Sequence, residues 1–326
     1  MLVCCGLVTL DVLQVVERLP GPDEKVVATG FELSFGGPAA NAAATAVALG
    51  VPTILVTALG TGFVADLVRG ALRDAGVGLV DLLDGAPAVP AVSTVLVTRA
   101  TGERAVVSTN ATRTGDLEHA ARRVADRVLA DAGALLVDGH HLGAARALAA
   151  HARRSDVPVV LDGGSWKPGL ETLLMHVDHA VLSAVFRLPA PLAEPPGIAG
   201  SARPAHLARQ GDLADEADLA PQHDRAGHDD LAAVARLGPR DVARSAGAGA
   251  LRYRLADGSR GQVEPEDVAV GEMVDTLGAG DVLHGAFAAR IVRGDDVVTS
   301  LRAGVRLATS SVRFQGARGW VGNVTS

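Results

Sequence analysis

Short apolar runs alternate with longer helical patterns along this chain, and this alternation restricts the possible folds more than any other feature. Neighbouring parallel strands need a long connection, which is usually a helix. The expected strands cover residues 2–8, 53–58, 134–137, 158–161 and 179–182, and the expected helices cover 39–49, 62–75, 117–132 and 142–153. With 326 residues, 48% of them hydrophobic, the chain is long enough for one large α/β domain with a small appendage.

Two segments depart from this alternation. Residues 12–35 and 89–109 have the pattern of strands joined in hairpins, and residues 100–103 supply the turn of the second hairpin. We therefore expect a small additional β-structure beside the main sheet. Ordinary surface hairpins are the simpler alternative.

The string V-D-T-L-G-A-G-D at residues 274–281 joins a glycine turn to a carboxylate and then to an apolar helical pattern. Gly278, Ala279 and Gly280 have no bulky side chain, so their N–H groups can surround an anion at the start of the expected helix. Asp281 would then lie beside a bound phosphate as a candidate base. A turn before a buried helix is the simpler interpretation of one G-x-G match, but the full string with both aspartates is far rarer.

A second string, F-G-G-P-A-A-N-A-A-A, places Gly36, Gly37 and Asn41 at the start of an alanine-rich helix. Together the two strings resemble the signatures of the ribokinase-like (PfkB-type) carbohydrate kinase family. The resemblance extends over most of the chain, through the opening strand with Asp11, L-V-D-G-H-H at 136–141 and V-L-D-G-G at 160–164.

This resemblance implies a single domain over residues 1–326, with a three-layer α/β/α fold around a mostly parallel sheet. It also implies that 12–35 and 89–109 form a β-lid over a sugar site, a lid that family members often use for homodimer contacts. The implied reaction is ATP-dependent phosphorylation of a primary hydroxyl on a sugar or sugar-like small molecule. ATP and Mg²⁺ are the implied cofactors.

The roles implied for the signature residues follow the needs of phosphoryl transfer. Asp281 is the base, and the N–H groups of Gly278, Ala279 and Gly280 form the anion hole. Thr276 borders the nucleotide together with the two glycines. Asp275 shapes the turn and borders a monovalent cation site, with K⁺ as the expected ion.

The sugar ligands implied by the resemblance are Asp11, Gly36, Gly37 and Asn41. A carboxylate can accept from two neighbouring hydroxyls, an amide can both donate and accept, and a glycine lets the backbone approach a sugar ring.

Asp138, His140 and His141 follow an expected strand, so they should reach the carboxyl edge of the sheet, where open α/β sheets bind ligands. Asp138 and His140 are therefore candidate substrate contacts. Hydrogen-bonded residues in the wall of the cleft are the alternative, and no third metal ligand has a suitable spacing.

Three further polar residues lie in or after the second hairpin segment. Arg104 could reach an anionic substituent of the substrate, or it could be an ordinary solvated arginine. Asn110 and Arg113 directly follow the hairpin and are additional candidates.

The expected nucleotide half departs from the family pattern. An Asn-x-x-Glu element is replaced by L-S-A-V-F at 182–186, and Ser245 and Gly247 stand where a Thr-x-Gly element is expected. Residues 187–246 fit poorly, and a long irregular segment inside a compact domain is unusual. A variable surface excursion, a disordered loop and a compensated frameshift are the three explanations.

Charge and cysteine content exclude several classes of protein. A net charge of -7, a pI of about 5.8 and the lack of a basic run argue against a nucleic-acid partner. Pro38 and Pro52 divide the longest uncharged stretch too finely for a membrane span, and no signal peptide is expected. Cys4 and Cys5 are adjacent in a strand and cannot easily bridge, which suits a reducing, cytoplasmic location.

Two other functions remain open. A nucleoside kinase would use the same fold and the same signatures. A catalytically impaired member that binds a sugar or nucleotide as a sensor would explain the irregular nucleotide half, whereas the intact Asp281 and its glycines favour catalysis.

Overall fold

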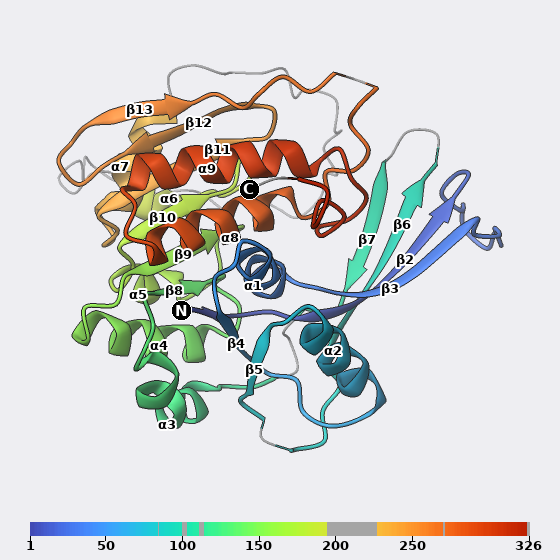
Figure 1. Ribbon diagram of the computed structural model, residues 1–326, viewed down its shortest axis with the longest axis horizontal. Helices are drawn as coiled ribbons and strands as arrows, with labels where there is room; N and C mark the ends of the chain where they lie inside the picture. The colour runs from blue at the N-terminus through green and yellow to red at the C-terminus, as the bar shows by residue number, and fades with distance from the viewer. Residues whose placement is uncertain (84, 100–102, 111–113, 194–226, 270, 325–326) are drawn as a thin grey trace, which may run out of the picture.

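A nine-stranded sheet lies at the centre of the computed structural model, which describes all residues except 84, 100–102, 111–113, 194–226, 270 and 325–326. Its strand order is β13-β12-β11-β10-β9-β8-β1-β4-β5 (Figure 1). All pairs from β11 to β5 are parallel, and β12 and β13 extend the edge in antiparallel pairing. The strands are β1 (Leu2–Cys5), β4 (Thr53–Thr57), β5 (Gly78–Asp81), β8 (Ala134–Val137), β9 (Val159–Gly163), β10 (His179–Leu182), β11 (Asp241–Ala246), β12 (Gly249–Arg254) and β13 (Arg260–Val263).

Helices cover both faces of this sheet, which explains why its central strands β1, β4, β8 and β10 are largely apolar rather than alternating. On β1, Leu2 and Cys4 pack into one core and Val3 and Cys5 into the other, so the two free cysteines point to opposite faces, as expected. One face carries α1 (Pro38–Ala48), α2 (Phe63–Asp74), α8 (Ala279–Val292) and α9 (Val297–Ser311). The other carries α3 (Glu118–Leu129), α4 (Leu142–Arg154), α5 (Leu170–Leu174) and α7 (Gly227–Ala235).

A separate four-stranded sheet stands at one side of the main body (Figure 1). Its order is β3-β2-β6-β7, with antiparallel pairs at both edges and a parallel pair between β2 and β6 in the middle. The strands are β2 (Thr9–Val16), β3 (Gly30–Gly36), β6 (Ala91–Thr98) and β7 (Arg104–Ser108). They come from the two segments that depart from the helix–strand alternation, and we call this sheet the lid.

The first expected strand is wrong in one respect. Residues 2–8 do not form one strand, because the chain leaves the main sheet after Cys5 and enters the lid at Thr9. Asp11 therefore lies on lid strand β2. The apolar run is continuous because Leu7, Val8 and Leu10 are buried where the two sheets meet.

The four helices expected from the sequence are present as α1, α2, α3 and α4, with ends that differ from expectation by three residues at most. Not one of the described helices combines the length and apolar character needed to cross a bilayer.

The poorly fitting segment at 187–246 contains regular structure at both ends. The short helix α6 (Ala190–Ala193) begins it, and α7 and β11 end it. Strand β11 tolerates charge because Asp241 pairs with His179 at 2.9 Å and Arg244 with Asp230 at 3.1 Å. The central part, 194–226, lies outside the described residues, as do Arg113 and residues 100–102 of the expected hairpin turn.

Candidate active site

The signature string forms a tight turn that leads into α8. Gly278 adopts φ 76° and caps the helix, and Val282 N–H makes the first helical bond, to Gly278 O at 2.9 Å. The N–H groups of Gly280 and Asp281 precede that bond, so they have no partner within the helix. Together with the positive end of the helix dipole, these two N–H groups can bind an anion, whereas the N–H of Ala279, another predicted donor, already donates to Thr276 O at 3.3 Å.

Gly278 and Gly280 serve different purposes. A Cβ on Gly278 would lie 2.2 Å from Ala317 Cβ, in addition to the left-handed backbone. Gly280 has an ordinary helical φ, and a Cβ there would meet no heavy atom within 4 Å. The turn geometry therefore requires glycine at position 278 and not at position 280. Gly280 leaves space directly in front of the helix.

Asp281 is held by a side chain from another helix. Asn41 Nδ2 on α1 donates to Asp281 Oδ2 at 2.7 Å. The two helices can approach closely because Gly285 on α8 faces the α1 backbone, where a Cβ would lie 2.5 Å from Ala42 O. Burial raises the pKa of Asp281 to about 7, and nearby Asp162 adds to the rise, while the Asn41 hydrogen bond opposes it.

Arg318, from the C-terminal part of the chain, contacts both Asn41 and the lid. Its Nη1 donates to Asn41 Oδ1 at 2.6 Å, and its Nη2 donates to Phe35 O at 2.8 Å. Its guanidinium carbon lies 3.8 Å from the centre of the Phe35 ring. One side chain therefore joins lid strand β3 to helix α1 beside Asp281.

The predicted sugar ligands Asp11, Gly36 and Gly37 lie where the lid joins α1. A Cβ on Gly36 would lie 1.9 Å from Asp11 Oδ2, so only glycine leaves room for that carboxylate. Gly37 has φ 97° and caps α1. Thr9 Oγ1 donates to Asp11 Oδ1 at 2.5 Å. Burial raises the pKa of Asp11, and the hydrogen bonds from Thr9 and Ser93 and the charge of Arg318 oppose this rise.

Two serines extend this polar surface across the lid. Ser93 pairs with Asp11 across β2 and β6, and Ser108 pairs with Ser93 across β6 and β7. Their hydroxyls are 3.0 Å apart. The sequence reasoning missed both, although alternation along the strands would have placed them on one face once the pairing was known.

A buried histidine, His284, meets a buried carboxylate, Asp162, behind the first turn of α8. His284 Nδ1 on α8 lies 2.6 Å from Gly280 O and 3.3 Å from Asp162 Oδ2, and Nε2 lies 3.0 Å from Val181 O. Burial raises the pKa of Asp162 and lowers that of His284, against the ring's contacts with the carbonyls of Val181 and Gly280. Because only an imidazolium can donate at both ring nitrogens, we take the charged ring as the form that satisfies these acceptors. The pair fixes the first turn of α8 against β9 and β10.

Asp138 accepts three backbone hydrogen bonds. Its Oδ2 accepts from Leu7 N at 2.8 Å and Ala39 N at 3.2 Å, and its Oδ1 accepts from His140 N at 2.8 Å. The carboxylate therefore joins β8 to the crossing between the sheets and to the start of α1. These contacts fit the alternative of a hydrogen-bonded cleft-wall residue better than a substrate contact.

The two histidines after Asp138 are largely enclosed. Burial is the main cause of a lowered pKa at both His140 and His141, and it lowers the pKa of His141 to about 4. Both rings are therefore neutral at pH 7. His141 lines a small recess with Thr114 and Asn110 at the base of the lid. The charge of Lys167, which lies after β9, also lowers the pKa of His140.

Asp275 and Thr276 connect the signature turn to its neighbours. Asp275 Oδ1 accepts from Leu277 N at 2.8 Å, and Oδ2 accepts from Gly316 N at 2.9 Å. Arg104 on lid strand β7 donates to Thr276 Oγ1 at 3.0 Å and lies 3.8 Å from Asp275. Arg104 thus contacts the signature turn itself.

Ser245 and Gly247 lie at the end of β11. Gly247 has φ 60° in the two-residue turn between β11 and β12, where Ala246 pairs with Gly249. The turn alone accounts for this glycine, because a two-residue hairpin turn of type II′ needs a positive φ at its first central residue, where glycine is preferred. Ser245 is half-buried beside it.

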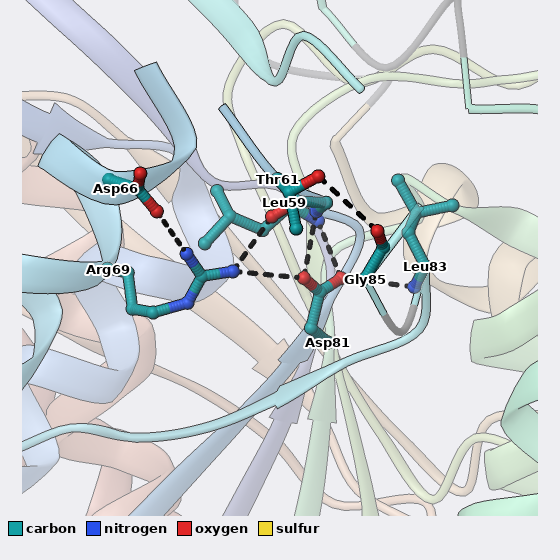
Figure 2. Close-up of polar contacts among 8 residues, drawn as sticks. Leu59, Thr61, Asp66, Arg69, Asp81, Leu83 and Gly85 are labelled. Carbon is teal, nitrogen blue, oxygen red and sulfur yellow. Dashed lines mark hydrogen bonds and ion pairs between the residues drawn. The ribbon is translucent and has the colours of Figure 1, made fainter. Parts of the chain in front are cut away.

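The loop between β4 and α2 is held by Asp81 at the end of β5. Its carboxylate accepts from Leu59 N, Gly60 N and Leu83 N at 2.8–3.0 Å and from Arg69 at 3.3 Å (Figure 2). This fixes the loop between β4 and α2. A recess of about 240 Å³ adjoins that loop and is lined by Ala58, Leu83, Ala86, Pro87, Ala88, Val89 and Thr114.

The comparisons with known proteins bear directly on this arrangement. The model of the pfkB family of carbohydrate kinases matches residues 1–184 and 214–320. This chain belongs to that family. The match omits 185–213, which includes the first part of the segment that the sequence identified as irregular.

Solved structures of kinases share the fold. The Arabidopsis thaliana ribokinase complexed with ribose and ATP has 22% sequence identity and a TM-score of 0.66, over 97% of this chain and 93% of the ribokinase. The Cryptococcus neoformans ribokinase in complex with ADP has 19% identity and a TM-score of 0.65, over 98% and 96%. The tetrameric inhibited form of Escherichia coli phosphofructokinase-2 has 16% identity and a TM-score of 0.68, over 95% and 93%. The ribokinase-like α/β fold expected from the sequence is thereby confirmed.

Proposed function

We propose that this pfkB-family protein transfers the γ-phosphoryl group of ATP to a primary hydroxyl of a sugar or sugar-like small molecule. The observation that carries the proposal is the position of Asp281. Its carboxylate lies in the first turn of α8, beside the free N–H groups of Gly280 and Asp281, and is oriented by Asn41. A base and an anion hole at one helix start are what phosphoryl transfer to an alcohol requires.

Asp281 would accept the proton of the attacking hydroxyl. Asn41 already donates to Oδ2, so Oδ1 is the oxygen available to the substrate. A carboxylate with a pKa of about 7 is matched to proton transfer at neutral pH. The N–H groups of Gly280 and Asp281 would stabilise the negative charge on the transferring group.

The α8 start fits a nucleotide phosphate, because the surface in front of Gly280 is open and faces the positive helix end. The described residues contain no cluster of three or more His, Cys, Asp or Glu side chains that could hold a metal alone. This suits Mg²⁺, which usually binds through phosphate oxygens and one or two carboxylates. Magnesium would neutralise phosphate charge in the transition state.

For the sugar we propose Asp11, Gly36, Gly37 and Asn41 as ligands. Asn41 has one N–H and one lone pair left after its contacts with Asp281 and Arg318, so it can still bind a hydroxyl. Asp11 offers its remaining lone pairs from the lid. Ser93 and Ser108 lie next to Asp11 in register and add two hydroxyls for a polyhydroxylated ligand.

The remaining cofactor assignments stay predictions. Thr276 would border the nucleotide with Gly278 and Gly280, and Ser245 and Gly247 would border it from β11. Asp275 would border a K⁺ site, although both of its oxygens already accept backbone N–H groups.

We also propose that the lid supports a homodimer. Its edge strands expose Phe31, Leu33, Val106 and Val107, which are apolar side chains on a small sheet. Apolar edge strands of this kind offer a surface for association with a second sheet. Light scattering on the wild type and on Phe31→Asp tests this, since a dimer through the lid should dissociate in the variant.

The test of the proposed activity is a product screen. The protein is incubated with ATP, Mg²⁺ and a panel of sugars, polyols and nucleosides, and phosphorylated products are detected by mass spectrometry. We expect a sugar-class acceptor to be phosphorylated at a primary hydroxyl. A nucleoside as the sole acceptor would support the nucleoside kinase, and thermal stabilisation by a sugar without any turnover would support the sensor.

A further inference from the structure

Arg318 is a largely buried cation that no signature of the sequence indicates. Its two hydrogen bonds end on Asn41 Oδ1 and Phe35 O, and its planar group stacks on the Phe35 ring. Burial lowers the pKa of Arg318, and the negative charges of Asp11, Glu32 and Asp281 oppose this lowering. The guanidinium remains charged, because arginine is not deprotonated in proteins.

The contact between Arg318 and Asn41 determines which way the Asn41 amide faces. Arginine can only donate, so the atom of Asn41 that faces it must be the acceptor Oδ1. The other end of the amide, Nδ2, then necessarily faces Asp281 Oδ2. If the amide turned over, Oδ1 would face the carboxylate and Nδ2 would face the guanidinium, and both contacts would become repulsive.

We propose that Arg318 is a positioning residue for the reaction, which acts through Asn41 to fix the orientation of Asp281. The proposal rests on the proposed function for its kinetic consequence. Three side chains are connected by two hydrogen bonds, in which Arg318 donates to Asn41 and Asn41 donates to Asp281. This hydrogen-bond network leaves Asp281 Oδ1 available for the hydroxyl of the substrate.

The hydrogen-bond network of Arg318, Asn41 and Asp281 should also favour the ionised form of Asp281. A donor at Oδ2 stabilises a carboxylate, whereas an amide oxygen there would stabilise the protonated acid. The other charged or titratable groups acting on Asp281 are Asp162 on β9, Asp138 directly after β8, and His284 on α8. Within the described part of the chain, none of these three side chains is hydrogen-bonded to Asn41, so the orientation of the amide depends on Arg318.

The first experiment is a double-mutant cycle with Arg318→Met and Asn41→Ala. Methionine keeps the apolar stem against Phe35 and removes the donors. We expect Arg318→Met to lower kcat at least tenfold with KM for ATP within twofold of wild type. In the Asn41→Ala background the same substitution should lower kcat less than threefold. Equal factors in the two backgrounds, or an unchanged kcat in folded Arg318→Met, would overturn the proposal.

Two further variants separate this role from loss of packing. Arg313 lies in the same C-terminal region but pairs with Glu272 at 3.2 Å, so Arg313→Met removes a nearby cation without touching Asn41. We expect it to keep kcat within twofold. Arg318→Lys retains one donor for Asn41 Oδ1 and should recover part of the activity lost in Arg318→Met.

A second measurement does not depend on turnover. The carboxyl carbons of aspartate are labelled with ¹³C, and Asp281 is assigned by comparison with Asp281→Asn and titrated by NMR. We expect the titration midpoint of Asp281 to move to higher pH in Arg318→Met and to stay in place in Arg313→Met. An unmoved midpoint in Arg318→Met refutes the positioning role. Absence of phosphorylation in the wild type, with a moved midpoint, would refute only the proposed function.

Discussion

Gly278 and Gly280 allow the proposed phosphate-binding role of the signature turn to be separated from its structural role. Only Ala279 separates the two glycines, yet substitution by valine should affect them differently. Valine at position 278 should lower stability, and valine at position 280 should lower turnover. At Gly278 a side chain requires the left-handed conformation and lies 2.2 Å from Ala317 Cβ. At Gly280 the backbone is helical and a Cβ meets nothing within 4 Å.

The expected magnitudes follow from these two environments. Gly278→Val combines the left-handed conformation, roughly 1–2 kcal/mol, with overpacking of about 1–3 kcal/mol, so the free energy of unfolding should fall by roughly 2–5 kcal/mol. Gly280→Val replaces a helical glycine, so its free energy of unfolding should stay within about 0.5 kcal/mol of wild type. Its turnover should nevertheless fall by at least about 10²-fold, because the side chain occupies the space in front of the anion hole.

Chemical denaturation and ATP consumption are measured on both variants, with sugar-induced thermal stabilisation as the control for an intact sugar site. Gly280→Val should retain wild-type stability and sugar binding and lose turnover. A stable Gly280→Val protein with full activity would mean that the signature segment is only a turn, and the kinase assignment of this site would lose its main support.

Three other predictions concern single side chains. Burial, followed by the charge of Asp162, raises the pKa of Asp281 to about 7, and a base must be ionised to act. We therefore expect kcat/KM to fall tenfold per pH unit below about pH 7. A pH–rate profile that is flat down to pH 5 would contradict this. Asp11→Ala should raise KM for the sugar by about 5- to 150-fold, which corresponds to about 1–3 kcal/mol, and leave KM for ATP nearly unchanged, so a change confined to ATP would show that the ligands are exchanged. Asp138→Ala should lower the free energy of unfolding by at least about 3 kcal/mol, because Leu7, Ala39 and His140 N–H lose their acceptor; denaturation midpoints check this, and a loss below about 1 kcal/mol would argue against the role of Asp138 in joining these segments.

The layered fold could be predicted from the sequence because its signals are local. The strands β8 and β10 are short apolar runs, the helices α1 to α4 are longer helical patterns, and the two hairpin segments lack such helices. The passage of the chain from the main sheet into the lid after Cys5 could not be predicted in this way. Leu7, Val8 and Leu10 are apolar because they are buried between sheets, so the sequence shows no break.

The candidate site was predictable where one string holds both the backbone and the chemistry. Asp281 with its glycines and Asn41 with Gly36 and Gly37 are such strings. The contact between Asn41 and Asp281 depends on how α1 and α8 pack, which no local pattern encodes.

Arg318 and His284 were missed for different reasons. Arg318 follows no periodic pattern and lies far along the chain from both of its partners. His284 stands one helical turn after Asp281, so helix spacing alone could have placed it near the base. Its ionic partner Asp162 comes from another strand and required the structure.

The most direct test of the central claim is the kcat of Asp281→Asn with the acceptor found by the product screen. The replacing amide is isosteric and can still accept from Asn41 Nδ2 through its oxygen, so the site should keep its geometry. Our account predicts that kcat falls by roughly 10² to 10⁴, while sugar affinity measured by thermal stabilisation stays nearly intact. A fall of less than tenfold in a folded variant would contradict the assignment of Asp281 as the base.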